Sequence, residues 1–242
     1  MEIKKLYTCG CSFMSVEVGG VHPIVSFLDL YAKSKGFKHI SLARSGATNF
    51  LIRLQIDHAI ANRADYVVIG TTSNDRIDLA IGVTGYPVVL EDVAYEHYGS
   101  HSQYHVLTNN PTVISDSISN WTEGNYEINV HGNQNRSVNT VTIQAMKHYV
   151  AYLHDTNLQT QKDYYVIAEG VRKLINLEIP FVLIPSASMS KCDWSFVGDQ
   201  LWTGPLPWSM PCGFDPSTVN HNPQPAHDLF VQTLEHMTVN WK

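Results

Sequence analysis

The stretch "ADYVVIG" (64–70) decides the fold. It is a continuous apolar run, and the strands of a parallel sheet that is covered on both faces have this pattern. Upstream of it, "IKKLYTCG" (3–10) and "FKHISLA" (37–43) are also predicted strands. The intervening segments 22–36 and 45–63 carry apolar residues at helical spacing. The order βαβαβ therefore predicts a parallel sheet with right-handed crossovers.

The same pattern resumes near the end of the chain. Segment 163–178 is a predicted helix, 179–186 a predicted strand, and 223–237 a predicted closing helix. Residues 77–162 interrupt the pattern and are rich in Asn, His, Ser, Thr and Tyr. Since a structureless loop of that length is uncommon, we expect an insertion with short strands and a helix near 139–155. The expectation is one α/β domain over 1–242 with this large insertion.

Composition limits the function classes. Apolar residues make up 44% of the 242 residues, charged residues 16%, and the formal net charge is −6. This composition predicts an ordinary globular protein and argues against a nucleic-acid binder, which needs clustered Lys and Arg. We find no signal peptide and no apolar run of membrane-spanning length, so we expect a soluble, cytoplasmic or otherwise non-membrane protein. The four cysteines fit no usual zinc spacing and are interpreted as buried or free thiols: Cys9, Cys11, Cys192 and Cys212.

Four polar segments are expected at one edge of the sheet. Ligands of open parallel sheets bind outside the carboxyl ends of the strands. The first three segments follow predicted strands, and the fourth precedes the closing helix: "GCSF" (10–13), "ARSGATN" (43–49), "GTTSNDR" (70–76) and "VNHNPQPAH" (219–227). Their chemistry-bearing residues are Ser12, Gly46, Asn74 and His221.

These segments resemble the four sequence blocks of the SGNH hydrolases, or GDSL-like esterases, which carry Ser, Gly, Asn and His in this order. "GCSF" has Cys11 where many members have Asp, and "IGTTSND" (69–75) is longer than the usual Gly-x-Asn-Asp. "HNPQPAH" (221–227) is similar to the last block. The resemblance covers 1–76 and about 165–240, and it implies a flavodoxin-like, three-layer α/β/α fold.

The resemblance also implies roles for these residues. Ser12 would be the nucleophile and His221 its general base, and the oxyanion hole would be formed by Ser12, Gly46 and Asn74. Most members have an Asp three residues before the catalytic His, where this chain has Thr218. The ring of His221 would then work without an acid, or Asp215 or a backbone carbonyl would orient it.

Each of these residues also has a structural interpretation. Ser12 suits an N-cap, and Gly46 and Asn74 suit ordinary turns. His227 competes with His221 for the catalytic role, but its place on the closing helix favours packing or hydrogen bonding there.

Further candidates concern the substrate. Arg76 suits either an acidic substrate group or the surface, and Trp202 and Trp208 suit either a sugar or acyl pocket or simple packing. The histidines of the insertion match no metal-ligand spacing, so we expect no metal site: His97, His101, His105, His131, His148 and His154.

Two functional hypotheses follow. The first is a serine esterase or deacetylase that removes an acyl group, such as acetyl, from a small molecule or carbohydrate, without any cofactor. The second is an SGNH-like module with weak or no catalysis that binds glycan or protein, which the missing Asp at position 218 favours. The sequence leaves the substrate and the oligomeric state open.

Overall fold

A computed structural model describes the central part of the domain and the termini that pack on it. Side chains are described for residues 3–11, 13–14, 26–43, 47–74, 148–149, 152–204 and 226–241, and the backbone alone for 76–80, 113–117, 127–129, 135–137 and 224–225. No helix of this described part is both long and apolar enough to cross a membrane.

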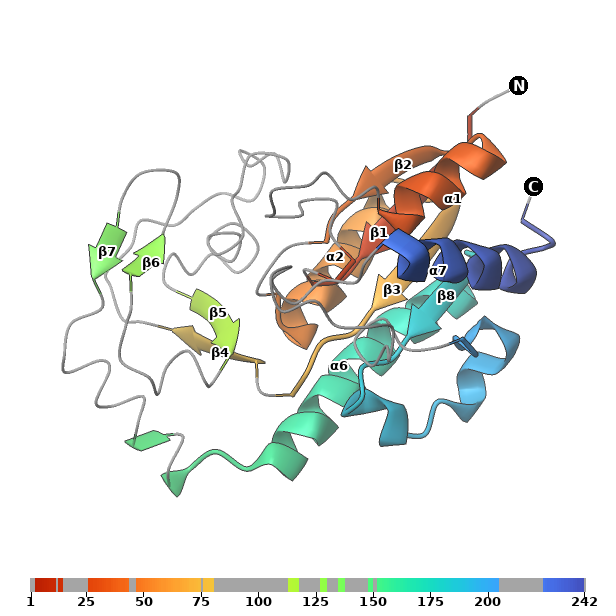
Figure 1. The fold of residues 1–242 in the computed structure, drawn as a ribbon. Coiled ribbons are helices and arrows are strands. Elements are labelled where there is room, and N and C mark those ends of the chain that lie inside the picture. The colour runs from red at the N-terminus through yellow and green to blue at the C-terminus, as the bar shows by residue number, and fades with distance from the viewer. Residues whose placement is uncertain are drawn as a thin grey trace.

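The central element is a parallel sheet of four strands (Figure 1). Their order is β2-β1-β3-β8, and every neighbouring pair runs parallel. The predicted α/β class and the predicted parallel pairing of the first three strands are confirmed. The strands are β1 (Lys5–Cys9), β2 (Lys38–Ser41), β3 (Tyr66–Gly70) and β8 (Phe181–Ile184).

Helices cover both faces of this sheet. α2 packs beside α6 on one face, and α1 beside α7 on the other (Figure 1). This arrangement is compatible with a three-layer α/β/α fold. The helices are α1 (Phe27–Lys35), α2 (Asn49–Ala61), α6 (Thr156–Asn176) and α7 (Gln224–Met237), with short 3₁₀ helices η3 (Met189–Lys191) and η4 (Ser195–Gln200) after β8.

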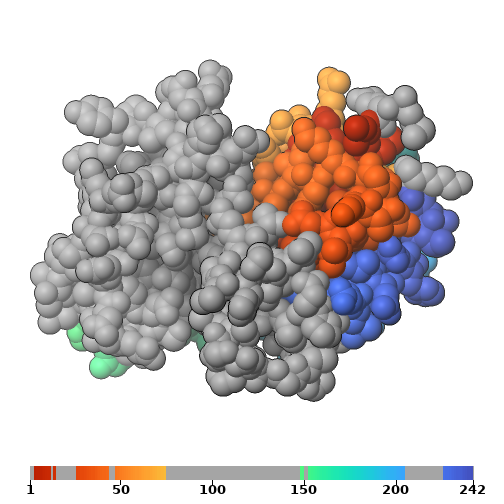
Figure 2. All heavy atoms as spheres, turned by 45° about the horizontal axis from the view of Figure 1, so that its top comes forward, coloured from red at the N-terminus to blue at the C-terminus, as the bar shows by residue number. Residues whose placement is uncertain are grey.

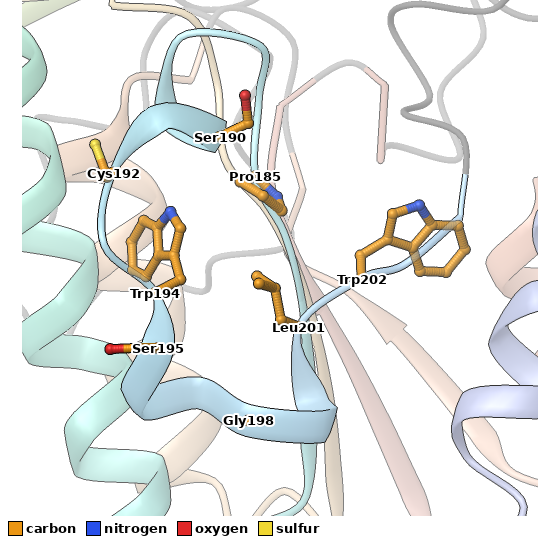
Figure 3. Close-up of a pocket in the computed structure, with 8 residues that line it drawn as sticks. All are labelled: Pro185, Ser190, Cys192, Trp194, Ser195, Gly198, Leu201 and Trp202. Atoms are coloured by element: carbon orange, nitrogen blue, oxygen red, sulfur yellow. The ribbon is translucent and has the colours of Figure 1, made fainter.

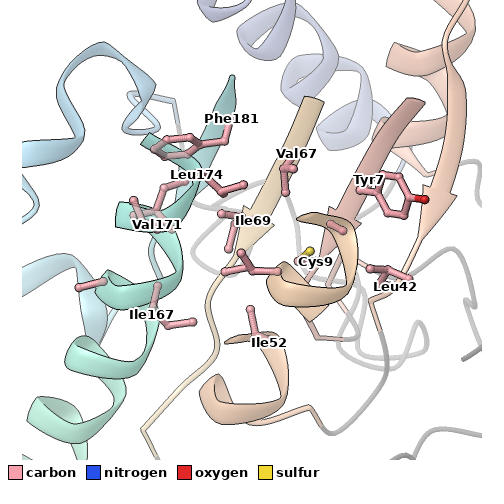
Figure 4. Close-up of a cluster of buried hydrophobic side chains, with 14 of the residues drawn as sticks. Tyr7, Cys9, Leu42, Ile52, Val67, Ile69, Ile167, Val171, Leu174 and Phe181 are labelled. Carbon is pink, nitrogen blue, oxygen red and sulfur yellow. The ribbon is translucent and has the colours of Figure 1, made fainter. Parts of the chain in front are cut away.

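The alternation of side chains along the strands produces two separate cores. Tyr7 and Cys9 of β1 point to the α2/α6 face, where they join buried residues such as Ile52 and Val171 (Figure 4). Leu6 belongs to the opposite core together with residues of α1 and α7. Figure 2 shows α1, in orange, and α7, in blue, forming one continuous surface on that side.

Two more strand pairs lie in the segment predicted to be an insertion. β4 (Arg76–Ala80) pairs antiparallel with β5 (Val113–Ser117), and β6 (Glu127–Asn129) pairs antiparallel with β7 (Asn135–Ser137). Neither pair is hydrogen-bonded to the central sheet.

Two helix starts differ from the prediction. Segment 22–36 was predicted to begin its helix around Pro23, but α1 begins at Phe27 because Ser26 caps it: its Oγ accepts the N–H of Leu28 at 3.2 Å. α6 begins seven residues earlier than predicted, at Thr156, since Asp155 accepts the N–H of Leu158 at 2.8 Å and caps it.

The strand order creates a switch point between β1 and β3. The chain passes from β1 to β2 on one side and returns to add β3 on the other side. At such a point the connections leave in opposite directions and open a crevice at the carboxyl ends of the two strands. A ligand would therefore bind at this edge of the sheet.

Candidate functional site

The residues that leave β1 and β3 are packed together at the switch point. The side chain of Met14 is fully buried and lies against both Gly10 and Gly70. A Cβ atom on Gly10 would lie 2.5 Å from Met14 Cγ, and one on Gly70 would lie 2.4 Å from the same atom. The two glycines are therefore required by the thioether wedged between them. The wedge is fixed by a turn in which the N–H of Met14 donates to Cys11 O at 2.9 Å.

Most of the residues predicted to be catalytic lie outside the described residues, although their neighbours in sequence are described. Cys11 and Phe13, on either side of Ser12, are buried and partly buried. α7 begins three residues after His221. The predicted residues that lie outside are Ser12, Gly46, Trp208, Asp215 and His221.

Asn74, the predicted oxyanion donor, is described and contacts the start of α6. Its side-chain amide donates to Thr160 Oγ1 at 2.6 Å and to Thr156 O at 3.3 Å. Its backbone N–H donates to Ser188 Oγ at 3.3 Å. The Asn74 amide is therefore turned toward the first turn of α6 in this state.

Two buried side-chain amides of α2 hold the strand ends, and the sequence analysis did not single them out. Gln55 Oε1 accepts the N–H of Gly10 at 2.6 Å, and its Nε2 donates to Gly10 O at 3.3 Å. Asn49 Oδ1 accepts the N–H of Thr72 at 2.9 Å, and its Nδ2 donates to Thr72 O at 3.0 Å. Gln55 lies four residues after the buried Leu51. A polar residue on this apolar stripe was the available signal.

A hydroxyl network joins the ends of β3 and β8. Ser186 donates its Oγ–H to Thr72 O at 2.8 Å, and its backbone N–H donates to Thr71 Oγ1 at 2.7 Å. Ser186 Oγ also lies 3.2 Å from Ser188 Oγ. The segments that follow both strands are therefore held to one another by buried polar groups.

Asp163 of α6 is the buried carboxylate of this edge. It accepts from Asn49 Nδ2 at 3.0 Å and from Gln159 Nε2 at 2.8 Å. The pKa of the nearby Cys192 thiol is raised mainly by burial and secondly by the negative charge of Asp163. The thiol is therefore protonated and uncharged at neutral pH.

A pocket of about 330 Å³ lies beside the end of β8 (Figure 3). Trp194 and Trp202 stand on opposite sides of Leu201 in this view. The indole N–H of Trp194 donates to Met189 O at 2.8 Å. The described residues that line it carry no charge: Pro185, Ser190, Cys192, Trp194, Ser195, Gly198, Leu201 and Trp202. Such a pocket suits an uncharged group.

The remaining predicted residues have mixed outcomes. Trp202 lines the pocket and also packs edge-on against Phe230, with ring centroids 6.3 Å apart, so both of its interpretations keep support. His227 is buried, and its Nδ1 accepts the N–H of Phe27 at 3.1 Å, which confirms its predicted hydrogen-bonding role. Arg76 begins β4, and its side chain lies outside the described residues.

A row of three side chains, a hydroxyl, an imidazole and a carboxylate, links β1, β2 and α1. Thr8 Oγ1 lies 2.8 Å from His39 Nε2, and His39 Nδ1 lies 2.6 Å from Asp29 Oδ1. The order of groups is that of a catalytic triad. Thr8, however, is completely buried within the sheet, so a substrate cannot approach its hydroxyl. We interpret this row as structural.

The described residues contain no group of three or more potential metal ligands, and Cys9, Cys11 and Cys192 among them are free thiols.

A scan against models of known protein families finds no match for the sequence, and a search of curated proteins finds none either.

Proposed function

We propose that the chain is a serine esterase of the SGNH hydrolase type, with a flavodoxin-like fold. Ser12 is the nucleophile, His221 the general base, and Ser12, Gly46 and Asn74 supply the oxyanion donors. The substrate is an acyl ester, such as an acetyl ester, of a small molecule or carbohydrate.

The observation that carries the proposal is the hydrogen bond between His227 Nδ1 and the N–H of Phe27. It joins the N-terminal ends of α7 and α1. A helix that follows a parallel strand begins at the edge where that strand ends, so both helices begin at the carboxyl edge of β1. His221 precedes α7 by three residues, and Ser12 follows β1 by three. The starts of α1 and α7 thus meet at one edge, and this supports placing Ser12 and His221 near each other.

The chemistry is acyl transfer. Ser12 Oγ attacks the ester carbonyl carbon while His221 takes the hydroxyl proton, and a tetrahedral oxyanion forms. His221 returns that proton to the departing alcohol as the carbon–oxygen bond breaks, which leaves an acyl-serine. A water molecule then attacks the acyl-serine while His221 takes its proton; His221 returns that proton to Ser12 Oγ as the acyl–oxygen bond breaks, and the acid is released.

The pocket of Figure 3 is the subsite for an uncharged part of the substrate. Neighbouring strands lie about 4.8 Å apart, so the end of β8 is about 10 Å from that of β1, across β3. Pro185 of the pocket directly follows β8. Leu201 of the pocket pairs with Leu183 on the side of β8 away from β3, so a substrate held in the pocket would extend over about 10 Å or more to the segment after β1.

The test is hydrolysis of p-nitrophenyl esters together with covalent labelling by a fluorophosphonate. We expect the wild-type protein to hydrolyse the acetate and butyrate esters faster than an ester whose acyl group carries a carboxylate. Ser12→Ala should abolish both hydrolysis and labelling, and His221→Ala should slow hydrolysis by about 100-fold or more. Ser34→Ala is the matched control, since Ser34 Oγ hydrogen-bonds Glu235 in another part of the molecule. Equal rates for wild type and Ser12→Ala would end the proposal.

A second candidate function is a glycan- or protein-binding module without catalysis. The observation that favours it is the contact of the Asn74 amide with Thr156 and Thr160, which turns the amide toward α6 in this state. Binding of a neutral oligosaccharide by a wild-type protein that neither hydrolyses esters nor labels at Ser12 would favour this candidate.

A further inference from the structure

The two buried amides of α2 occupy equivalent places at the ends of neighbouring strands. Gln55 holds Gly10, the first residue after β1, and Asn49 holds Thr72, the second residue after β3. Both amide side chains belong to residues with no exposed surface. In each pair the side chain binds both the N–H and the C=O of a single residue.

These contacts continue the hydrogen bonding of the sheet where the ladder ends. Buried backbone groups beyond a strand end still need partners. A side-chain amide offers one donor and one acceptor group, as a peptide of a neighbouring strand does. Because the amide comes from a helix beneath the edge, no further strand has to cover the crevice. The strand ends are thus fixed by side chains of α2.

Each held residue precedes a proposed catalytic residue by two positions: Gly10 precedes Ser12, and Thr72 precedes Asn74. Two residues of extended chain span at most about 7 Å, so each held peptide limits where the catalytic residue can lie. Asn49 is fixed in turn by Asp163, which accepts from its Nδ2 at 3.0 Å.

We propose that Gln55 and Asn49 are positioning residues, which set the relative placement of the nucleophile and the Asn74 oxyanion donor by holding the peptides of Gly10 and Thr72. This inference rests on the proposed esterase function. Displacement of a catalytic group by about 1 Å can cost on the order of 100-fold in rate. Loss of either amide should therefore lower kcat and leave KM nearly unchanged, since neither side chain reaches the pocket lining.

The test compares Gln55→Met with Arg53→Met, a matched control on the same helix. Arg53 is buried like Gln55, but it pairs with Asp57 and Glu169 between α2 and α6, away from the strand ends. Both variants should lower the melting temperature. Only Gln55→Met should lower kcat and the labelling rate, by about 10- to 100-fold at a temperature where both variants are folded. Gln55→Glu keeps an acceptor for the Gly10 N–H and should restore part of kcat.

A second measurement does not depend on activity. Amide hydrogen exchange should accelerate at Gly10 in Gln55→Met and at Thr72 in Asn49→Leu, with the other amide unaffected in each case. Unchanged exchange at both amides would overturn the inference, as would an active Gln55→Met with wild-type kcat. A wild-type protein without hydrolysis or labelling would instead overturn the proposed function, and the exchange data would still show whether the amides hold the strand ends.

Discussion

A methyl group added at Gly70 has no room while Met14 stays in place. The added Cβ would lie 2.4 Å from Met14 Cγ and 2.7 Å from its Sδ, whereas non-bonded heavy atoms prefer about 3.5–4 Å. Met14 must therefore move by about 1 Å or more inside a packed core, and such overpacking costs about 1–3 kcal/mol. Alanine loses less backbone entropy than glycine in a strand, which offsets about 0.5–1 kcal/mol. We expect Gly70→Ala to lower the free energy of unfolding by about 0.5–2 kcal/mol.

The cause can be isolated with a double-mutant cycle. Met14→Ala alone should cost about 2–5 kcal/mol, because it empties a fully buried site. In that background Gly70→Ala should become neutral or stabilising, so the two changes should couple by about 1–3 kcal/mol. Urea denaturation followed by tryptophan fluorescence and circular dichroism measures all four free energies.

Gly36→Ala is the control for this cycle. Gly36 caps α1 with φ 69°, and an added Cβ would meet nothing within 4 Å. Its substitution should cost about 1–2 kcal/mol through backbone strain alone, and Met14→Ala should not relieve it. If the Gly70 and Met14 changes add without coupling, the steric argument for the wedge is wrong.

Three further outcomes are expected. Burial opposes ionisation of Asp65, but its hydrogen bonds to the start of β1 outweigh this and lower its pKa. Its stabilising effect should therefore be present above about pH 4 and lost as the pH falls through the lower folded pKa. The urea midpoints of Asp65→Asn and wild type should then converge as the pH falls below about 4, and a constant difference would contradict this. His227→Leu leaves the buried N–H of Phe27 without its acceptor and should cost about 1–3 kcal/mol, which an unchanged melting temperature would disprove. Burial, and then Asp163, raise the pKa of the Cys192 thiol. At pH 7 iodoacetamide should therefore alkylate Cys192 more slowly in the folded than in the urea-unfolded protein. Equal rates would contradict the raised pKa.

Strands β3 and β8 of the central sheet were predictable because their burial is visible in the sequence. The run at 64–70 gives β3, which is buried throughout, and the apolar run at 179–186 contains β8. The start of α6 was missed because Thr156–Lys162 is largely exposed and has no apolar periodicity; Leu158, for example, is 50% exposed. Periodicity reports a helix only where the helix packs.

The site was less predictable for a related reason. Turn residues such as Asn74 are visible as polar interruptions after a strand, but their partners are set by tertiary contacts with α6, 82 and 86 residues away. The buried positions of Asn49 and Gln55 on α2 do not by themselves identify the groups that the two amides bind. The backbone groups that they bind depend on which strand end lies opposite them, and that depends on the order β2-β1-β3-β8.

The attachment of Asn74 to the first turn of α6 has a dynamic consequence. The helix is anchored to the core from Asp163 onward, where its buried residues begin, whereas Thr156 and Thr160 lie on the turn before that anchor. Helix ends unwind at little free-energy cost compared with global unfolding. Transient unwinding of this one turn releases the amide of Asn74 while the buried half of the helix stays folded. The availability of that amide to a ligand then depends on a local equilibrium, to which the Asp155 cap contributes on the folded side.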